Sequence, residues 1–420
     1  TVPVRVVPSP DDVDRIIDQV SENLHRQDMH ARETRDAIEQ LAMIGVSAAQ
    51  IAKRVALPRG TVDSALTVVA NPATKERMDA AGMTLEDAAT FAEFEDDPGA
   101  IATLTQAWES PYQRPRIAHI VQRLRNERAD AQALQAEVDR LRDEGLPVLD
   151  PRDAPQDLHR HRLAQLRDAD GQHVPEEQWP AVTGVAVVVT VEWSEQDDED
   201  DVEPSEPEQV YVPVWICTDP QAAGLHYGTT GPRSDVPTGQ QNEEEQAARE
   251  AEAEARREAE SAQRRRVIAN NKAWKAAEVV RREWLAGFLT RRSVPAGAEA
   301  LIARAVIGSE YSLSYALQHG HALLPGLLGI KPVEDSTPAY YGNRATCARI
   351  VEQATTPKAA TMRTLAAVIA AWEGRSGTHT WRNPSAWDAV VMGALVGWGY
   401  PASEVEQLLI AGDNDATEQN

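Results

Sequence analysis

The spacing of apolar residues along the chain predicts a mainly helical protein. Apolar positions three and four residues apart predict one helix over 32–44, a second over 47–55 and a third over 58–69. Ser47 can cap the second helix, and Pro58 suits the start of the third because its φ angle is already helical. More short helices are expected to follow these three.

A strand and a helix are predicted before this group, and a long helix after it. The Val-rich segment 2–7 has the composition of a strand, and 11–24 has apolar residues at helical spacing. A heptad-like spacing over 117–141 predicts a long helix, interrupted by a charged residue at Glu127. This helix either packs on its own domain or forms a coiled coil with a second chain.

The rest of the chain is predicted to divide into four regions. Two Val-rich segments, 182–193 and 210–217, are expected to pair as strands, and the acidic segment 195–208 between them to be a disordered loop. In chain order we expect a small β-containing region with this loop (146–240), a charged helical spacer (241–266), a helical C-terminal domain (267–412) and a disordered tail (413–420). Six of the ten tryptophans lie in the helical domain; we expect those at 372–398 in its core, and the alternative is that they stack on bases.

Composition and charge restrict the classes of function that the chain can have. Lys and Arg total 42 against 66 Asp and Glu, a net charge of −24, so any contact with DNA must come from a local basic patch. Two cysteines are too few for a disulfide framework or a four-thiolate zinc site, which favours a cytoplasmic protein. We recognise no signal peptide at the start of the chain and no apolar segment of the length that spans a membrane.

The helices predicted at 47–55 and 58–69 form a candidate helix-turn-helix. Val62 and Leu66 are expected to be buried, so the other side of the second helix faces solvent at its N-terminus. In helix-turn-helix domains, this end of the second helix meets the base edges. Arg59 can then reach guanine, and Thr61 and Ser64 can touch bases or phosphates. The alternative is a purely structural pair of short helices joined by a tight turn.

A second candidate site lies upstream, in the segment ENLHRQD at 22–28. A carboxylate, an amide and a guanidinium within five residues could hold a metal-bound triphosphate. Glu22 and Asn23 would face a hard cation and Arg26 would face the phosphates. The alternative is an ordinary helix end with polar capping residues.

Together these segments resemble the ParB-type partition proteins of the ParB/RepB family. The strand VPVRVV, the box ENLHRQD and the helix-turn-helix IAKRVALPRGTV follow one another in the order of that family. The segment FAEFEDDPGAIATL is similar to the helical part that comes next in actinobacterial plasmid- or phage-like members. The resemblance covers residues 1–145, about a third of the chain.

The resemblance implies the end of a nucleotide-binding domain at 1–28 and a DNA-binding domain at 29–145. It implies CTP and Mg²⁺ as ligands, with Glu22 and Asn23 at the metal and Arg26 at the phosphates; CTP hydrolysis is implied on the same ground alone. It places six residues at the DNA: Lys53, Arg54, Arg59, Gly60, Thr61 and Ser64. The family's glycine–arginine phosphate box is expected upstream of the strand at 2–7, so this chain is expected to bind CTP poorly.

We therefore expect a sequence-specific DNA-binding protein of plasmid or chromosome partition, cytoplasmic and associated with the nucleoid. Its partners would be a palindromic, centromere-like DNA duplex, a ParA-type ATPase and a second copy of the chain, with no membrane involved. A helix-turn-helix repressor of a plasmid or phage is the alternative. A ParB-like nuclease is disfavoured, because no paired carboxylates with His or Lys stand out near the DNA-binding region.

Overall fold

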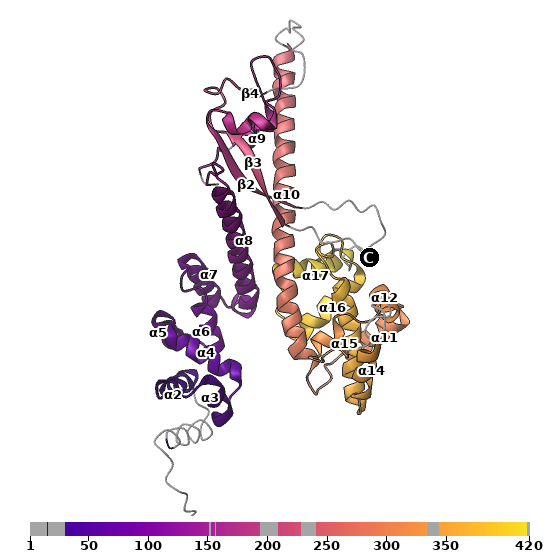
Figure 1. The fold of residues 1–420 in the computed structure, drawn as a ribbon. Helices are drawn as coiled ribbons and strands as arrows, with labels where there is room; N and C mark the ends of the chain where they lie inside the picture. Colours follow the sequence, from indigo (N-terminus) through magenta and orange to yellow (C-terminus); the bar gives the residue numbers. More distant parts are fainter. Residues whose placement is uncertain are drawn as a thin grey trace, which may run out of the picture. The chain divides into compact units, whose positions relative to one another are not determined.

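The computed structural model describes residues 15, 30–150, 153–155, 157–193, 209–227, 241–333 and 344–417. These residues are mainly helical, with two small antiparallel sheets, which confirms the predicted class (Figure 1). The predicted strand at 2–7, the helix at 11–24 apart from Arg15, and the acidic loop at 195–208 lie outside the described residues. The chain divides into two compact units, Thr1–Val121 and Gln122–Asn420.

Unit 1 is a group of short helices packed around α4 (Figure 1). Its elements are α2 (Ala31–Met43), α3 (Ala48–Val55), α4 (Arg59–Ala70), α5 (Pro72–Ala81), α6 (Leu85–Ala92), α7 (Pro98–Glu109) and the 3₁₀ turn η1 (Arg114–Arg116). The three helices predicted from 32 to 69 are confirmed as α2, α3 and α4. Val62, Ala65 and Val68 of α4 are fully buried. Leu66 was expected to be buried but is half-buried. The buried face of α4 consists of Val62, Ala65 and Val68, which are three residues apart, and Leu66 lies beside this face.

Ion pairs join α2 to α5 beside this core. Arg35 of α2, only 1% exposed, donates from Nη1 to Oδ1 of Asp79 at 2.7 Å and also bonds Asp36. Nζ of Lys75 lies 2.7 Å from a carboxylate oxygen of Glu39. The hydrogen bond from Arg35 holds the pKa of Asp79 below its ordinary value. The helices that flank α4 are therefore held by paired charges as well as by apolar contacts.

Unit 2 contains the two sheets, a long helix and a helical domain. Its elements are α8 (Ile117–Asp143, which begins in unit 1), α9 (Leu158–His161), η2 (Leu163–Gln165), β1 (Leu166–Arg167), η3 (Glu176–Ala181), β2 (Val185–Trp193), β3 (Gln209–Cys217), β4 (His226–Tyr227), α10 (Gln241–Leu289), α11 (Ala298–Ile307), α12 (Tyr311–His319), α13 (Leu324–Leu327), α14 (Arg344–Glu352), α15 (Pro357–Arg375), α16 (Ala386–Gly397) and α17 (Glu404–Thr417). Strands β2 and β3 form one sheet, and β1 and β4 form the other. None of the helices in the described ranges has the length and apolar character needed to cross a bilayer.

The hairpin of β2 and β3 confirms the two strands predicted to pair, and it covers the end of α8. Val187 and Val189 of β2 share a buried cluster with Val138 and Leu141 of α8. The hydroxyl of Tyr211 in β3 donates to a backbone carbonyl of α8 at 3.0 Å. The last apolar positions of the heptad-like spacing are thus buried within their own domain, as one of the two interpretations expected.

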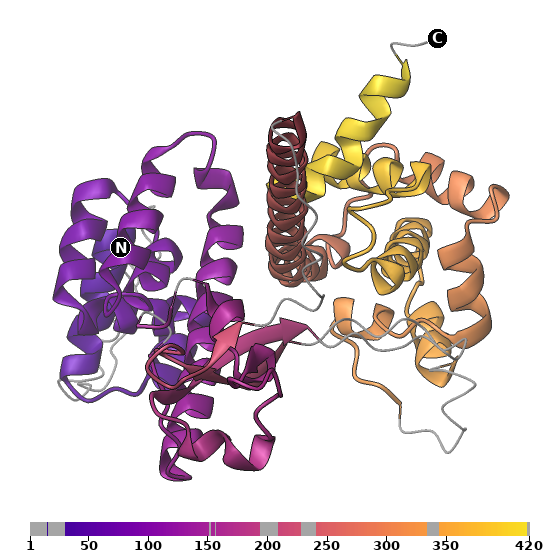
Figure 2. The same ribbon diagram turned by 90° about the horizontal axis from the view of Figure 1, so that it is seen from above.

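Helix α10 joins the predicted spacer to the C-terminal domain without a break. It has 49 residues, so the boundary expected between 266 and 267 falls inside one helix. From Trp274 onward, its apolar residues belong to the core that it shares with the helices that follow. Figure 2 is viewed nearly along the axis of α10 and shows these helices next to it. Trp372 and Trp387 are buried in the same core, as the sequence predicts for this domain, whereas Trp381 and Trp398 are half-buried and pack against it.

Helix α17 corrects the expected disordered tail at 413–420. It continues through Thr417, and only the last three residues lie outside the described part of the chain. Val405 and Leu409 anchor α17 in the domain core. Once such an anchored turn exists, each further residue adds a hydrogen bond at little cost, so the helix extends into the polar sequence.

The core of the C-terminal domain encloses a charged cluster. Arg281 of α10 is fully buried and donates at 2.6 Å to a carboxylate oxygen of Glu373 in α15 and, also at 2.6 Å, to one of Glu406 in α17. Tyr400 and Ser403 donate their hydroxyl protons to Glu406. Burial alone would lower the pKa of Arg281, but the two carboxylates outweigh it and raise that pKa above its ordinary value. The three helices are therefore linked by charges that cannot be separated without a large penalty.

Replacing Arg281 with Met is expected to lower the free energy of unfolding by about 3–5 kcal/mol, because two buried carboxylates lose their shared cation. Arg282→Ala is the matched control. Arg282 also bonds Glu373 but is 37% exposed, so its loss should cost at most about 1–2 kcal/mol. Guanidinium unfolding followed by tryptophan fluorescence measures both. Equal losses would contradict a special role for the buried arginine.

Candidate functional site

The predicted DNA-contacting residues lie on α3 and α4. Ser47 caps α3 as expected: its Oγ accepts from the backbone N–H of Gln50, and the Gln50 side chain accepts from the backbone N–H of Ser47 at 3.2 Å. The apolar side of α3 is buried through Ile51 and Val55, both fully inaccessible. Helix α3 is therefore held at its start by a cap and along one side by the core.

The turn between the two helices is short and strained. Ala56 adopts φ +56° and ψ +35°, the left-handed conformation that residues with a Cβ avoid. Pro58 was expected within the first turn of α4, but its ψ of 140° is extended and places it one residue before the helix. Proline has no side-chain oxygen, so Pro58 does not cap the first backbone N–H groups of α4.

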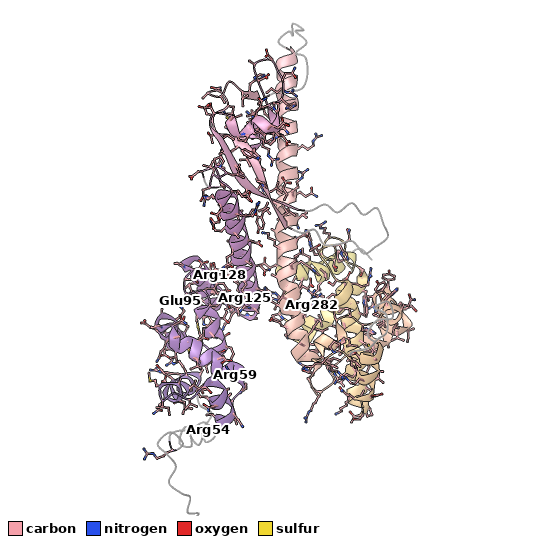
Figure 3. The ribbon with its side chains drawn as sticks, viewed as in Figure 1. Arg54, Arg59, Glu95, Arg125, Arg128 and Arg282 are labelled. Atoms are coloured by element: carbon pink, nitrogen blue, oxygen red, sulfur yellow. The ribbon has the colours of Figure 1, made fainter. Side chains whose placement is uncertain are left out.

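All six predicted residues lie on these two helices, and none is buried. Lys53 and Arg54 are exposed in the last turn of α3, and Arg59 and Gly60 are exposed at the start of α4. The other two, Thr61 and Ser64, are half-buried. Figure 3 labels Arg54 of α3 and Arg59 of α4, which lie at the same end of unit 1.

Two carboxylates contact these residues, and neither is among the predicted site residues. Nε of Arg59 donates to both carboxylate oxygens of Asp63, at 2.8 and 2.9 Å. The hydroxyl of Thr61 donates to Oε1 of Glu86, in the first turn of α6, at 3.1 Å. The four-residue spacing of Arg59 and Asp63 is visible in the sequence. Glu86 is 25 residues from Thr61 and is brought to it only by the packing of α6 on α4.

No contact within the protein explains why residue 60 is a glycine. A Cβ added at this position would meet nothing within 4 Å, and the backbone there is not left-handed. Glycine is a weaker helix former than alanine, so local folding does not favour it here. The surface at Gly60 is therefore open and lets another molecule come close to the backbone of α4.

The candidate nucleotide site cannot be built in the same way. Glu22, Asn23 and Arg26 lie outside the described residues. Within the described ranges, no three His, Cys, Asp or Glu side chains converge as metal ligands.

Comparisons of this chain with protein-family models, with curated proteins and with solved structures find no match. The resemblance to ParB-type proteins thus stays a hypothesis that rests on the sequence motifs.

Ala56→Gly is expected to stabilise the pair of helices by about 0.5–1 kcal/mol. Glycine removes a left-handed penalty of about 1–2 kcal/mol, less the entropy that it adds to the unfolded chain. Ala52→Gly, in the middle of α3, is the control and should instead cost about 1 kcal/mol. Hydrogen exchange of the α3 and α4 amides reports the local opening free energy. The same sign for both variants would contradict strain at Ala56.

Proposed function

We propose that unit 1 binds DNA sequence-specifically as a helix-turn-helix domain, with α4 as its recognition helix. The observation that carries the proposal is the local charge. Residues 47–66 contain three cations, Lys53, Arg54 and Arg59, against one carboxylate, Asp63, in a chain whose net charge is −24. All three cations are exposed. Such a local patch is what an acidic protein needs in order to attract the phosphate backbone.

The burial of α4 supports its role as the reading element. Because Val62, Ala65 and Val68 face the core, the first residue of the helix, Arg59, faces solvent. A guanidinium in this place can meet O6 and N7 of guanine with two hydrogen bonds. The neighbouring cations of α3, Lys53 and Arg54, would contact phosphates, which orient the protein but carry no sequence information.

The start of α4 offers further support. Its first N–H groups receive no cap from Pro58, and the positive end of the helix dipole lies there. A DNA phosphate can accept from such N–H groups. Gly60 leaves room for the phosphate to approach.

The wider role that we propose is DNA partition of the ParB type, and its support is the order of the sequence motifs in residues 1–145. The DNA site would be palindromic and would bind two copies of the chain, because a two-fold protein matches a two-fold site. A ParA-type ATPase would be the protein partner. The helical C-terminal domain is our candidate for the contact between the two copies.

Substitution of two cations tests DNA binding. The probe is the duplex that the wild-type chain selects from random duplexes long enough for two half-sites about 10 base pairs apart. Arg59→Ala should weaken binding to this duplex by roughly 5- to 150-fold, the value of a bidentate guanine contact of about 1–3 kcal/mol. Lys53→Ala should weaken binding to the selected duplex and to a scrambled one alike and reduce the salt dependence.

Fluorescence anisotropy gives the affinities, and light scattering should find two chains on each duplex. Failure of the wild-type chain to select any sequence would refute the proposed function. Selection that survives Arg59→Ala unchanged would refute the choice of recognition residue.

The nucleotide part of the proposal is that Glu22, Asn23 and Arg26 bind CTP with Mg²⁺. Because residues 1–420 alone are expected to bind CTP poorly, the test uses a chain that also carries the glycine–arginine phosphate box upstream of the strand at 2–7. In that chain, Asn23→Ala should reduce the heat of CTP binding in a calorimetric titration with Mg²⁺, because it removes an expected metal ligand. Arg15→Ala, on the same predicted helix but outside the box, is the control and should leave the heat unchanged. Equal heats for wild type and both variants would contradict the assignment of Asn23.

A further inference from the structure

The ion pair between Arg59 and Asp63 engages only one side of the guanidinium. Both oxygens of Asp63 accept from Nε of Arg59, at 2.8 and 2.9 Å. Among the described residues, the terminal nitrogens Nη1 and Nη2 of Arg59 donate no hydrogen bond. These two nitrogens are a pair of parallel donors of the kind that meets O6 and N7 of guanine.

The pair contributes little to the stability of the fold. The side chains are 56% and 51% exposed, and exposed pairs of this spacing add little to stability. The order, with the cation first and the acid four residues later, is the less favourable one on a helix. A cation at the first residue of α4 also opposes the helix dipole. The stability of α4 therefore does not explain why an arginine is found at position 59 and an aspartate at position 63.

We propose that Asp63 is a positioning residue for base recognition: it holds the guanidinium of Arg59 by Nε so that Nη1 and Nη2 face a guanine edge. This inference rests on the proposed function. A free arginine side chain loses rotamer freedom when it binds, and a side chain that is already held loses less. Asp63 would thus raise affinity for the correct base pair without touching the DNA.

Electrostatics alone predicts the opposite effect of Asp63. A carboxylate next to a DNA-binding helix repels phosphates, so its removal should strengthen binding to every duplex. Glu86 provides the matched comparison, because it is a second exposed carboxylate against α4 but is bonded to Thr61 and not to Arg59. If Asp63 positions Arg59, its removal weakens specific binding. If Asp63 only repels phosphates, its removal strengthens binding, as the removal of Glu86 should.

The experiment measures the affinities of Asp63→Ala and Glu86→Ala in the complete chain, for the selected duplex and for a scrambled one. Asp63→Ala should weaken binding to the selected duplex by less than Arg59→Ala does, because the guanidinium remains but is no longer held, and leave or raise binding to the scrambled duplex. Glu86→Ala should leave or raise both. Asp63→Glu, which can still reach Arg59 across one helical turn, should recover part of the loss.

Two further measurements show that Asp63 acts through Arg59. In the Arg59→Ala background, Asp63→Ala should cause no further loss, and selection with Asp63→Ala should lose preference at the same base pair as selection with Arg59→Ala. If Arg59→Ala weakens specific binding but Asp63→Ala strengthens it, as Glu86→Ala does, the positioning role is refuted and the DNA-binding proposal stands. If Arg59→Ala itself has no effect on specific binding, the assignment of Arg59 fails first.

Discussion

The inward face of α4 is the constraint on which both the packing of unit 1 and its candidate site depend. Val62, Ala65 and Val68 are fully buried, and α4 packs against α2, α3, α5 and α6. Each residue of a helix is rotated by about 100° from the one before, so burial of these three sets the direction of all the others. Arg59 and Asp63, four residues apart, are therefore left together on the outside. The apolar residues that stabilise the domain also decide which polar side chains can meet a ligand.

Much of unit 1 could be predicted from the sequence because its signals are local. Apolar spacing defined α2, α3 and α4 to within one residue at each end, and the cap at Ser47 was visible in the letters around it. The contact between Thr61 and Glu86 was not predictable, since it depends on how α6 packs on α4. The exposure of Leu66 depends on the same packing: periodicity identifies an apolar side of a helix, but the neighbouring helices decide how much of that side is covered.

Unit 2 shows two further limits of sequence patterns. The heptad-like spacing of α8 predicted an apolar side but not its partner, and the structure covers the end of that side with Val187 and Val189 of the same chain. The change of composition near residue 266 suggested a boundary, yet α10 passes through it. Ala, Glu and Arg are all strong helix formers, so a low-complexity spacer and a domain helix can be one continuous element. The charged cluster around Arg281 was not foreseen, because its carboxylates come from distant parts of the chain.

That distance has a consequence for synthesis on the ribosome. Arg281 is 92 residues before Glu373 and 125 residues before Glu406. At about 5–20 residues per second, the second carboxylate is made roughly 6–25 s after the arginine. Until then, a nascent domain that buried Arg281 would hold a cation with an incomplete set of partners, at a cost of several kcal/mol. The C-terminal domain is therefore expected to fold only once α17 has been translated, and the unfinished chain keeps α10 in contact with water in the meantime.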